Sequence, residues 1–210
     1  MYTGVILAGG RSRRFGENKA LVQLVGKPLI VYVHEQLARI VDEIIIVISK
    51  LSDKSIYTNL LGKETTILTD LSDIQIPLMG ALTGFTYAKG EYTILLSCDT
   101  PFISQKVMRF LLDMSKDMNA VIPRWPNGYI EPIQAVYKTH PALQSTKGAL
   151  RKGKLEFRSM INDMQNVRYV STSVIEKMDP ALISFFNINT LAELRKAEET
   201  IRKRNVQDDA

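Results

Sequence analysis

Glycine and basic residues follow a short hydrophobic segment near the start of the sequence, in GVILAGGRSRRFGENKAL (4–21). Gly9 and Gly10 carry no side chains, so backbone N–H groups can converge there on an anion. Positive charge is supplied close by, from Arg11, Arg13, Arg14 and Lys19. Bare backbone N–H groups and positive charge together indicate a loop that binds phosphate.

This loop matches neither of two familiar phosphate-binding motifs. A Walker loop requires glycine, four residues and then Gly-Lys-Ser/Thr, whereas five residues separate Gly10 from Gly16 and Glu17 follows. The Gly-x-Gly-x-x-Gly pattern of dinucleotide-binding folds is absent as well. Ala-Gly-Gly also occurs in ordinary turns flanked by solvated arginines, so the loop alone does not identify a function.

Two aspartates follow β-branched segments elsewhere in the chain. Asp99 ends YTILLSCD (92–99) and Asp70 ends TTILTD (65–70). One carboxylate combined with substrate phosphates is the usual way in which proteins hold Mg²⁺, because this ion keeps several waters. Asp99 is therefore a candidate magnesium ligand, although a helix cap is an alternative role for it.

The segments around these residues alternate between strand-like and helix-like patterns. Short hydrophobic runs indicate strands covered on both faces, at 3–8, 43–49, 65–70, 92–99 and 119–125. Helical spacing separates them, at 28–40, 55–62, 80–90 and 104–116, with Pro28 expected in a first helical turn and Ser104 as an N-cap. The later segments predict strands at 129–138 (half-covered) and 166–172 and a last helix at 190–204.

This alternation predicts a doubly wound α/β fold, with a mostly parallel sheet and helices on both faces. Ligands of such sheets bind at the carboxyl ends of the strands, near the point where strand order reverses. The glycine loop, Asp70 and Asp99 are therefore expected at one edge. We expect a single domain over residues 1–210, in which the pattern changes after Trp125 and separates a first half (1–125) from a second half (126–210).

Composition narrows the class of ligand and the compartment. A net charge of +5 without a basic, aromatic-rich stripe disfavours nucleic acid and favours a small anionic ligand. The single cysteine, Cys98, cannot form an internal disulfide and is expected to be a buried apolar residue. No secretory pattern or membrane-spanning run is found, so the predicted location is cytoplasmic, with no membrane partner.

Five motifs in order resemble the molybdenum cofactor guanylyltransferase family, within the nucleotidyltransferase superfamily. They are LAGGRSRRFGENKALVQLVGKPLI (7–30), PLMGALTGF (77–85), SCDTPFIS (97–104), EPIQAVYK (131–138) and FFNINTLAEL (185–194). Together they reach nearly the whole chain. The resemblance implies a Rossmann-like nucleotidyltransferase fold and transfer of GMP from GTP to the terminal phosphate of molybdopterin, with release of pyrophosphate. It also implies that residues 1–125 form the nucleotide-binding half and residues 126–210 the acceptor-substrate half.

The resemblance also implies roles for individual residues. Arg14, Lys19 and a Mg²⁺ ion on Asp99 would neutralise the phosphates, together with N–H groups of the loop. A phosphate monoester is already mostly ionised at neutral pH, so His34 and His140 are expected to be structural. The residues expected at the nucleotide are Leu7, Ala8, Gly9, Gly10, Lys19, Asp70 and Asp99.

Guanine selection is assigned to Asp70, with Asp73 as a close competitor, because a carboxylate can accept from N1–H and the exocyclic amine. Glu131, Pro132, Asn187 and Asn189 are expected on the acceptor side. Arg124 is a candidate for the acceptor phosphate and Trp125 for ring stacking, with core or rim packing favoured for Trp125. Proteins that mature molybdoenzymes are further implied partners.

Three departures from the family pattern bear mainly on the base. Asn18 stands where the family usually has aspartate, and IQIPL (74–78) replaces a glycine-containing turn. Ser49 is the nearest polar candidate for an expected asparagine. The open alternatives are a CTP-dependent molybdopterin cytidylyltransferase, a transferase with a sugar-phosphate, isoprenoid or phospholactate acceptor, and a nucleotide-binding regulatory protein without turnover.

Overall fold

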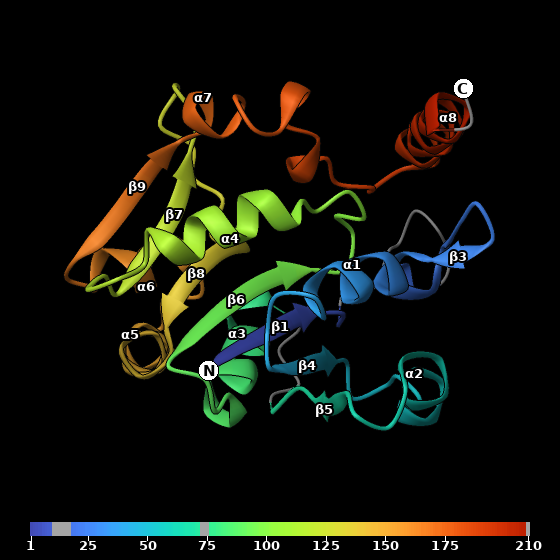
Figure 1. Ribbon diagram of the computed structural model, residues 1–210. Helices are drawn as coiled ribbons and strands as arrows, with labels where there is room; N and C mark the ends of the chain where they lie inside the picture. Colours follow the sequence, from blue (N-terminus) through green and yellow to red (C-terminus); the bar gives the residue numbers. More distant parts are fainter. Residues whose placement is uncertain (10–17, 72–75, 209–210) are drawn as a thin grey trace.

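The computed structural model describes residues 1–9, 18–71 and 76–208, with side chains to residue 203 (Figure 1). Its core is a seven-stranded sheet in the order β5-β4-β1-β6-β8-β7-β9. The strands are β1 (Tyr2–Leu7), β4 (Glu43–Ile48), β5 (Thr66–Thr69), β6 (Tyr92–Ser97), β7 (Ala120–Arg124), β8 (Gln134–Lys138) and β9 (Val167–Ser171). A two-stranded hairpin, β2 (Gln23–Leu24) with β3 (Lys27–Pro28), lies outside this sheet.

The sheet is mostly parallel, as the sequence predicts. β1 pairs in parallel with β4 and β6, β4 pairs with β5, and β7 pairs with β9. Strand order reverses beside β1, because the chain adds β4 and β5 on one side and then β6 on the other. In register, Leu7 lies opposite both Val47 and Ser97. The carboxyl ends of these central strands therefore meet at one edge, next to the switch in strand order.

The prediction for residues 129–138 was wrong in two respects. Strand β8 begins only at Gln134, and it runs antiparallel between β6 and β7 with both faces buried. Pro132 has no N–H to donate to a ladder, and Asn127 and Gly128 form a turn before it. Residues 129–133 are thus a connection, which leaves their side chains available at the edge of the sheet.

Helices cover both faces of the sheet, as predicted (Figure 1). One face packs against α1 (Leu29–Leu37), α2 (Lys54–Leu61) and α4 (Gln105–Asp113), and the other against α3 (Pro77–Tyr87), α5 (Thr139–Arg151) and α6 (Phe157–Asn162). Alternate residues of the strands point to opposite faces, so Ile6 and Val5 lie in separate core clusters. Close packing on the second face depends on Gly84, because a Cβ there would overlap Val5.

Local signals set the ends of several helices. The Ser104 hydroxyl accepts from the N–H of Val107, as expected for the N-cap of α4. Asp53 caps α2 in a similar way, through the N–H of Ser55. Pro28 precedes α1 as its N-cap instead of lying in the first turn, because its backbone is still extended (ψ 143°) and it pairs with Gln23 in the hairpin.

The last part of the chain packs beside the sheet. It contains α7 (Thr172–Ile175), the 3₁₀ segment η2 (Pro180–Phe185) and α8 (Leu191–Asp208), which lies near the β2–β3 hairpin (Figure 1). A third core cluster joins these parts, with Ala197 of α8 packed among Leu24, Leu29 and Ile188. None of the helices in the described part of the chain has the length and apolar character needed to cross a bilayer.

Candidate active site

A cavity of about 590 Å³ lies at the carboxyl edge of the central strands, the place that the fold predicts for a ligand. Its wall combines the ends of β1, β4 and β6 with the 129–133 connection, the start of β8 and the segment before α8. Most of the predicted site residues line it: Leu7, Gly9, Lys19, Asp70, Asp99, Glu131, Pro132, Asn187 and Asn189.

The remaining predicted residues lie elsewhere or outside the described part of the chain. Ala8 is 1% exposed, and its side chain belongs to the core, so only its backbone is near the cavity. Arg124 lies over the ring of Tyr169 and is not among the cavity residues. Outside the described residues are Gly10, Arg11, Arg13, Arg14 and Asp73.

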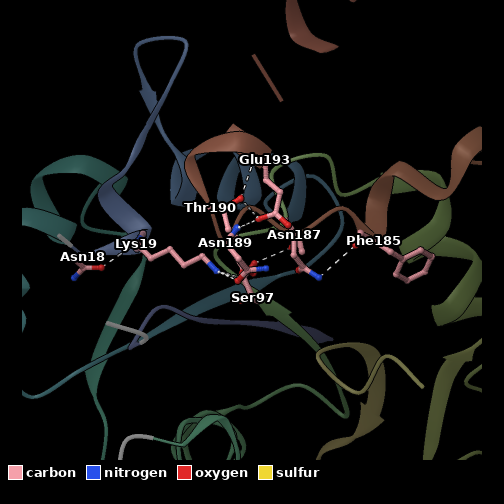
Figure 2. Close-up of polar contacts among 11 residues, drawn as sticks. Asn18, Lys19, Ser97, Phe185, Asn187, Asn189, Thr190 and Glu193 are labelled. Carbon is pink, nitrogen blue, oxygen red and sulfur yellow. Dashed lines mark hydrogen bonds and ion pairs between the residues drawn. The ribbon is translucent and has the colours of Figure 1, made fainter. Parts of the chain in front are cut away.

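Lys19 connects its own segment to two distant parts of the chain, the end of β6 and the segment before α8 (Figure 2). It lies in the short 3₁₀ helix η1 (Lys19–Leu21), and its Nζ forms an ion pair with Asp99 Oδ2 and donates to Asn189 Oδ1 at 2.6 Å. Both members of the ion pair are largely buried, with 13% and 12% of their side-chain surfaces exposed. The ammonium group is therefore held at the end of β6 by two oxygens.

Asn18 fixes the start of this short helix. Its Oδ1 accepts from the N–H of Ala20, and its Nδ2 donates to the hydroxyl of Tyr57 at 2.8 Å and to Ser52 Oγ at 3.3 Å. A carboxylate could accept from Ala20 but has no hydrogen to donate to either hydroxyl. The departure from the family's aspartate thus adds donors that anchor η1 and, through it, Lys19.

Asp99 has the features expected of a cation ligand. Its Oδ2 pairs with Lys19, whereas its buried Oδ1 has no hydrogen-bond partner among the described residues. A buried acceptor without a partner is costly unless a donor or cation reaches it. No group of three or more acidic, histidine or cysteine side chains suited to a metal occurs in the described ranges. A single carboxylate is nevertheless enough for Mg²⁺ when phosphates and waters complete its shell.

Hydrogen bonds at the start of α8 hold the Asn-Ile-Asn segment against the cavity (Figure 2). The Glu193 carboxylate accepts from the backbone N–H of Asn189 at 2.7 Å and from the Thr190 hydroxyl at 3.0 Å. Burial raises the pKa of Glu193, but these hydrogen bonds outweigh it, so its pKa lies below the ordinary value. Ile188 also donates its N–H to the carbonyl of Asp99 at 2.9 Å. The segment is thereby fixed to the residue that it faces.

Asp70 lies at the end of the cavity near α3. The Thr83 hydroxyl lies 3.2 Å from Asp70 Oδ1 and accepts from the N–H of Leu71, so it holds this carboxylate in place. Gly80 brings bare backbone close to this carboxylate, since a Cβ at that position would lie 3.2 Å from Leu7 Cδ2 and 3.8 Å from Asp70 Oδ2 and would crowd Leu7. An uncluttered apolar surface next to an acceptor suits a flat ring that carries N–H donors.

Of the three residues expected to be structural, the two histidines lie outside the cavity, whereas Cys98 is among the residues that line it. His34 Nε2 is 2.8 Å from the Thr65 hydroxyl, away from the cavity, and burial lowers its pKa. His140 contacts Gln144 and does not line the cavity. Cys98 is buried, and burial raises its pKa to about 12, so its thiol is not ionised at neutral pH.

Comparison with known proteins agrees with this geometry. The sequence profile of the MobA-like NTP transferase domain matches residues 4–167, most of the chain. The chain belongs to this family. A molybdenum cofactor guanylyltransferase from Desulfosudis oleivorans is 37% identical over 95% of this chain and 96% of its own length.

Two other relatives point the same way for this MobA-like protein. A probable molybdenum cofactor guanylyltransferase from Methanosarcina mazei is 32% identical over 91% of this chain and 88% of its own. The crystal structure of molybdopterin-guanine dinucleotide biosynthesis protein A from Archaeoglobus fulgidus superimposes with a TM-score of 0.79 at 28% identity. That alignment covers 96% of this chain and 99% of the archaeal one, so the likeness extends over the whole fold.

Sequence reasoning missed part of the wall on the acceptor side. Tyr129 lines the cavity and is 58% exposed, and Gln134 lines it with its Oε1 buried and without a partner in the described structure. Trp125 is not among the cavity residues; it packs edge-to-face on Phe185 and donates its indole N–H to Glu131 Oε1 at 2.7 Å. The signal in the sequence was that Trp125, Tyr129 and Gln134 lie close to the Glu-Pro motif. Because a strand was expected at 129–138, the side chains that reach the cavity could not be told from those that do not.

Proposed function

We propose that this MobA-like protein is a molybdenum cofactor guanylyltransferase, which transfers GMP from GTP to the terminal phosphate of molybdopterin and releases pyrophosphate. The observation that carries the proposal is one cavity that is lined by Asp70, by the Lys19–Asp99 pair and, on the acceptor side, by Glu131. A base acceptor, a charged centre for phosphates and a second wall are what a two-substrate transfer requires. The names of the relatives support this reaction.

The nucleotide would bind at the end of the cavity formed by β1, β5 and α3. Asp70, held by Thr83, would accept from N1–H and the exocyclic amine of guanine, a donor pair that adenine lacks. Leu7 and Gly9 would contact the base and ribose, with Ala8 contributing backbone only. Gly80 also lines this end of the cavity, where a side chain would crowd Leu7. Asp73 remains a competitor for the base.

The phosphates would lie over the Lys19–Asp99 pair. Lys19 would neutralise charge that develops on the phosphate oxygens. Arg14 and the N–H of Gly10, which are expected at the site from the sequence alone, would do the same. Asp99 would hold Mg²⁺, which would supply positive charge to the phosphates when bound. The acceptor phosphate is already ionised near neutral pH, so the chain needs to position it and not to deprotonate it.

The second substrate would enter from the half of the chain after residue 125. Glu131, Pro132, Asn187 and Asn189 line this side, and Asn189 already contacts Lys19. Molybdopterin bound here would place its phosphate toward the charged centre. Proteins that mature molybdoenzymes remain predicted recipients of the product.

The proposal is tested by thermal shift with GTP, CTP, UTP and ATP in Mg²⁺, followed by pyrophosphate release with molybdopterin. A nucleotide at about 100 times its dissociation constant adds ~2.7 kcal/mol of stability, a shift of several degrees in a domain of this size. We expect GTP to give the largest shift and Asp70→Asn to remove that preference. Preference for CTP would favour the cytidylyltransferase alternative, and no turnover with any acceptor would favour the regulatory one.

Asp99 and Lys19 give a separate test of the charged centre. Loss of either side chain should raise the activation barrier by about 2.7–4 kcal/mol, the effect of removing one preorganised charge-stabilising group. Single-turnover assays of Asp99→Asn over a range of Mg²⁺ concentrations measure this. Turnover near the wild-type rate would show that the phosphates and the ion lie elsewhere.

A further inference from the structure

The connection between β7 and β8 forms a rigid wall on the acceptor side of the cavity. The N–H of Trp125 donates to the carbonyl of Tyr129 at 2.8 Å, and the N–H of Glu131 donates to that of Pro123 at 3.0 Å. The N–H of Tyr129 is taken up by the side chain of Asn127 at 3.0 Å. These bonds fix the backbone, so the side chains of the wall project from defined positions.

Within this wall, Trp125 controls the position of Glu131. The indole is held by its edge-to-face contact with Phe185 at 5.9 Å, and its N–H reaches Glu131 Oε1 at 2.7 Å. Glu131 is half-buried, and burial raises the pKa of its carboxyl, although the indole hydrogen bond acts in the opposite direction. One oxygen is thus used inside the protein, and Oε2 has no hydrogen-bond partner among the described residues.

Two side-chain oxygens on this side of the cavity lack hydrogen-bond partners among the described residues, and both are acceptors. Glu131 offers Oε2, and Gln134, which is 3% exposed, offers an Oε1 without a partner while its Nε2 donates to the carbonyl of Ser184. A phosphate would be repelled by such a surface, whereas a ring edge with N–H donors would be bound. Tyr129 adds an exposed aromatic face in the same cavity, suited to stacking on a flat ring.

We propose that Glu131, positioned by Trp125 and flanked by Tyr129, binds the aminopyrimidinone edge of the pterin ring of the acceptor. The inference rests on the proposed function for the identity of the acceptor and adds its orientation. The ring lies against the acceptor-rich wall, and the phosphate points toward Lys19 and Asp99. Trp125 is a positioning residue, because it acts through Glu131.

The test uses pterin itself and lumazine, in which a carbonyl oxygen replaces the amino group of pterin. Each ligand is titrated into the full-length protein without nucleotide, and its own fluorescence reports binding. A carboxylate facing the amino group should favour pterin by about tenfold or more, the usual size of a hydrogen bond to a charged group. Lumazine instead presents an oxygen to the carboxylate and is repelled.

The variants separate the two carboxylates of the cavity, because guanine and pterin share the same edge. Glu131→Gln should abolish the preference for pterin, and Asp70→Asn should leave it unchanged. Trp125→Phe should reduce the preference about threefold and should have no further effect in the Glu131→Gln background, whereas a merely structural role would weaken both ligands equally. Tyr129→Ala should weaken both ligands, while Tyr87→Ala, an exposed tyrosine outside the cavity, should weaken neither.

Three results would overturn the inference: no binding of pterin to the wild type, a preference that disappears in Asp70→Asn, or a preference that survives Glu131→Gln. The titration requires neither GTP nor phosphate transfer. Failure of guanylyl transfer in the activity assay would therefore count against the proposed function alone, and these three results count against the pterin subsite alone.

Discussion

Replacing Lys19 with methionine tests how much stability the charged centre contributes in the absence of ligand. The substitution keeps most of the length of the side chain and removes its charge. Neither Asp99 Oδ1 nor Oδ2 would then have a partner among the described residues, in a place where the side chain is only 12% exposed. Removing one partner of a buried ion pair costs about 3–5 kcal/mol, because the other charge stays buried without compensation.

The partial exposure of both groups places the expected loss near the lower limit, about 3 kcal/mol. The entropy of unfolding is about 2.1 cal/mol/K per residue, hence about 0.44 kcal/mol/K for 210 residues. Lys19→Met should therefore lower the unfolding midpoint by about 7 °C in the absence of nucleotide and Mg²⁺. The assay is thermal unfolding followed by circular dichroism.

Lys27→Met is the matched control, since Lys27 pairs with Glu35 at 2.8 Å and both side chains are well exposed. Exposed pairs contribute about 0–1 kcal/mol, so the midpoint should change by no more than about 2 °C. Adding Asp99→Asn to Lys19→Met should restore part of the loss by removing the unpaired carboxylate. A Lys19→Met protein as stable as the Lys27→Met control would refute the argument from burial.

Three further predictions follow from packing, pH and positioning. Gly84→Ala should lower the free energy of unfolding by about 1–3 kcal/mol, because it forces a methyl group against Val5. Gly148→Ala has open space around it and should raise the free energy of unfolding by about 0.4–1 kcal/mol. Equal effects in denaturant unfolding would contradict the packing. Burial raises the folded-state pKa of Glu131, so the wild type loses stability as pH rises through that pKa. Glu131→Gln should therefore be the more stable protein at neutral pH, and the difference between the two unfolding midpoints should shrink on acidification. A midpoint difference independent of pH would refute this. Thr83→Val should weaken GTP binding about fivefold in calorimetry with little effect on ATP, because it removes the hydroxyl that contacts the Asp70 carboxylate. Equal loss for both nucleotides would indicate a general defect.

Most of the fold could be predicted because the central strands are buried on both faces. Ile44, Ile45 and Ile46 lie side by side in β4 for that reason, and such runs are distinctive in a sequence. Strand β8 could not be predicted as well. Its direction depends on pairing with β6 and β7, which no local pattern specifies. The alternation at 129–138 indicated a strand with one exposed face, but β8 is buried on both faces.

The site was predictable where it depends on the ends of strands. Asp70 and Asp99 each end a recognisable strand segment, and the fold brings both to one cavity. Side-chain pairing was not predictable: nothing local in the sequence shows that the Trp125 indole donates to Glu131 instead of stacking on a ligand. The hydroxyl–carboxylate contact between Thr83 and Asp70 is equally invisible, because it joins a helix to a strand end.

The bond between Lys19 and Asn189 has a consequence for the synthesis of the protein. The two residues are 170 positions apart, so a ribosome that adds about 5–20 residues per second needs roughly 9 to 34 s after making Lys19 to supply its partner. Through that interval, the sheet can grow around the early strands while the charged centre is still incomplete. Full assembly of the cavity is thus a late event in the life of each new chain, and it marks a molecule whose last segment has docked.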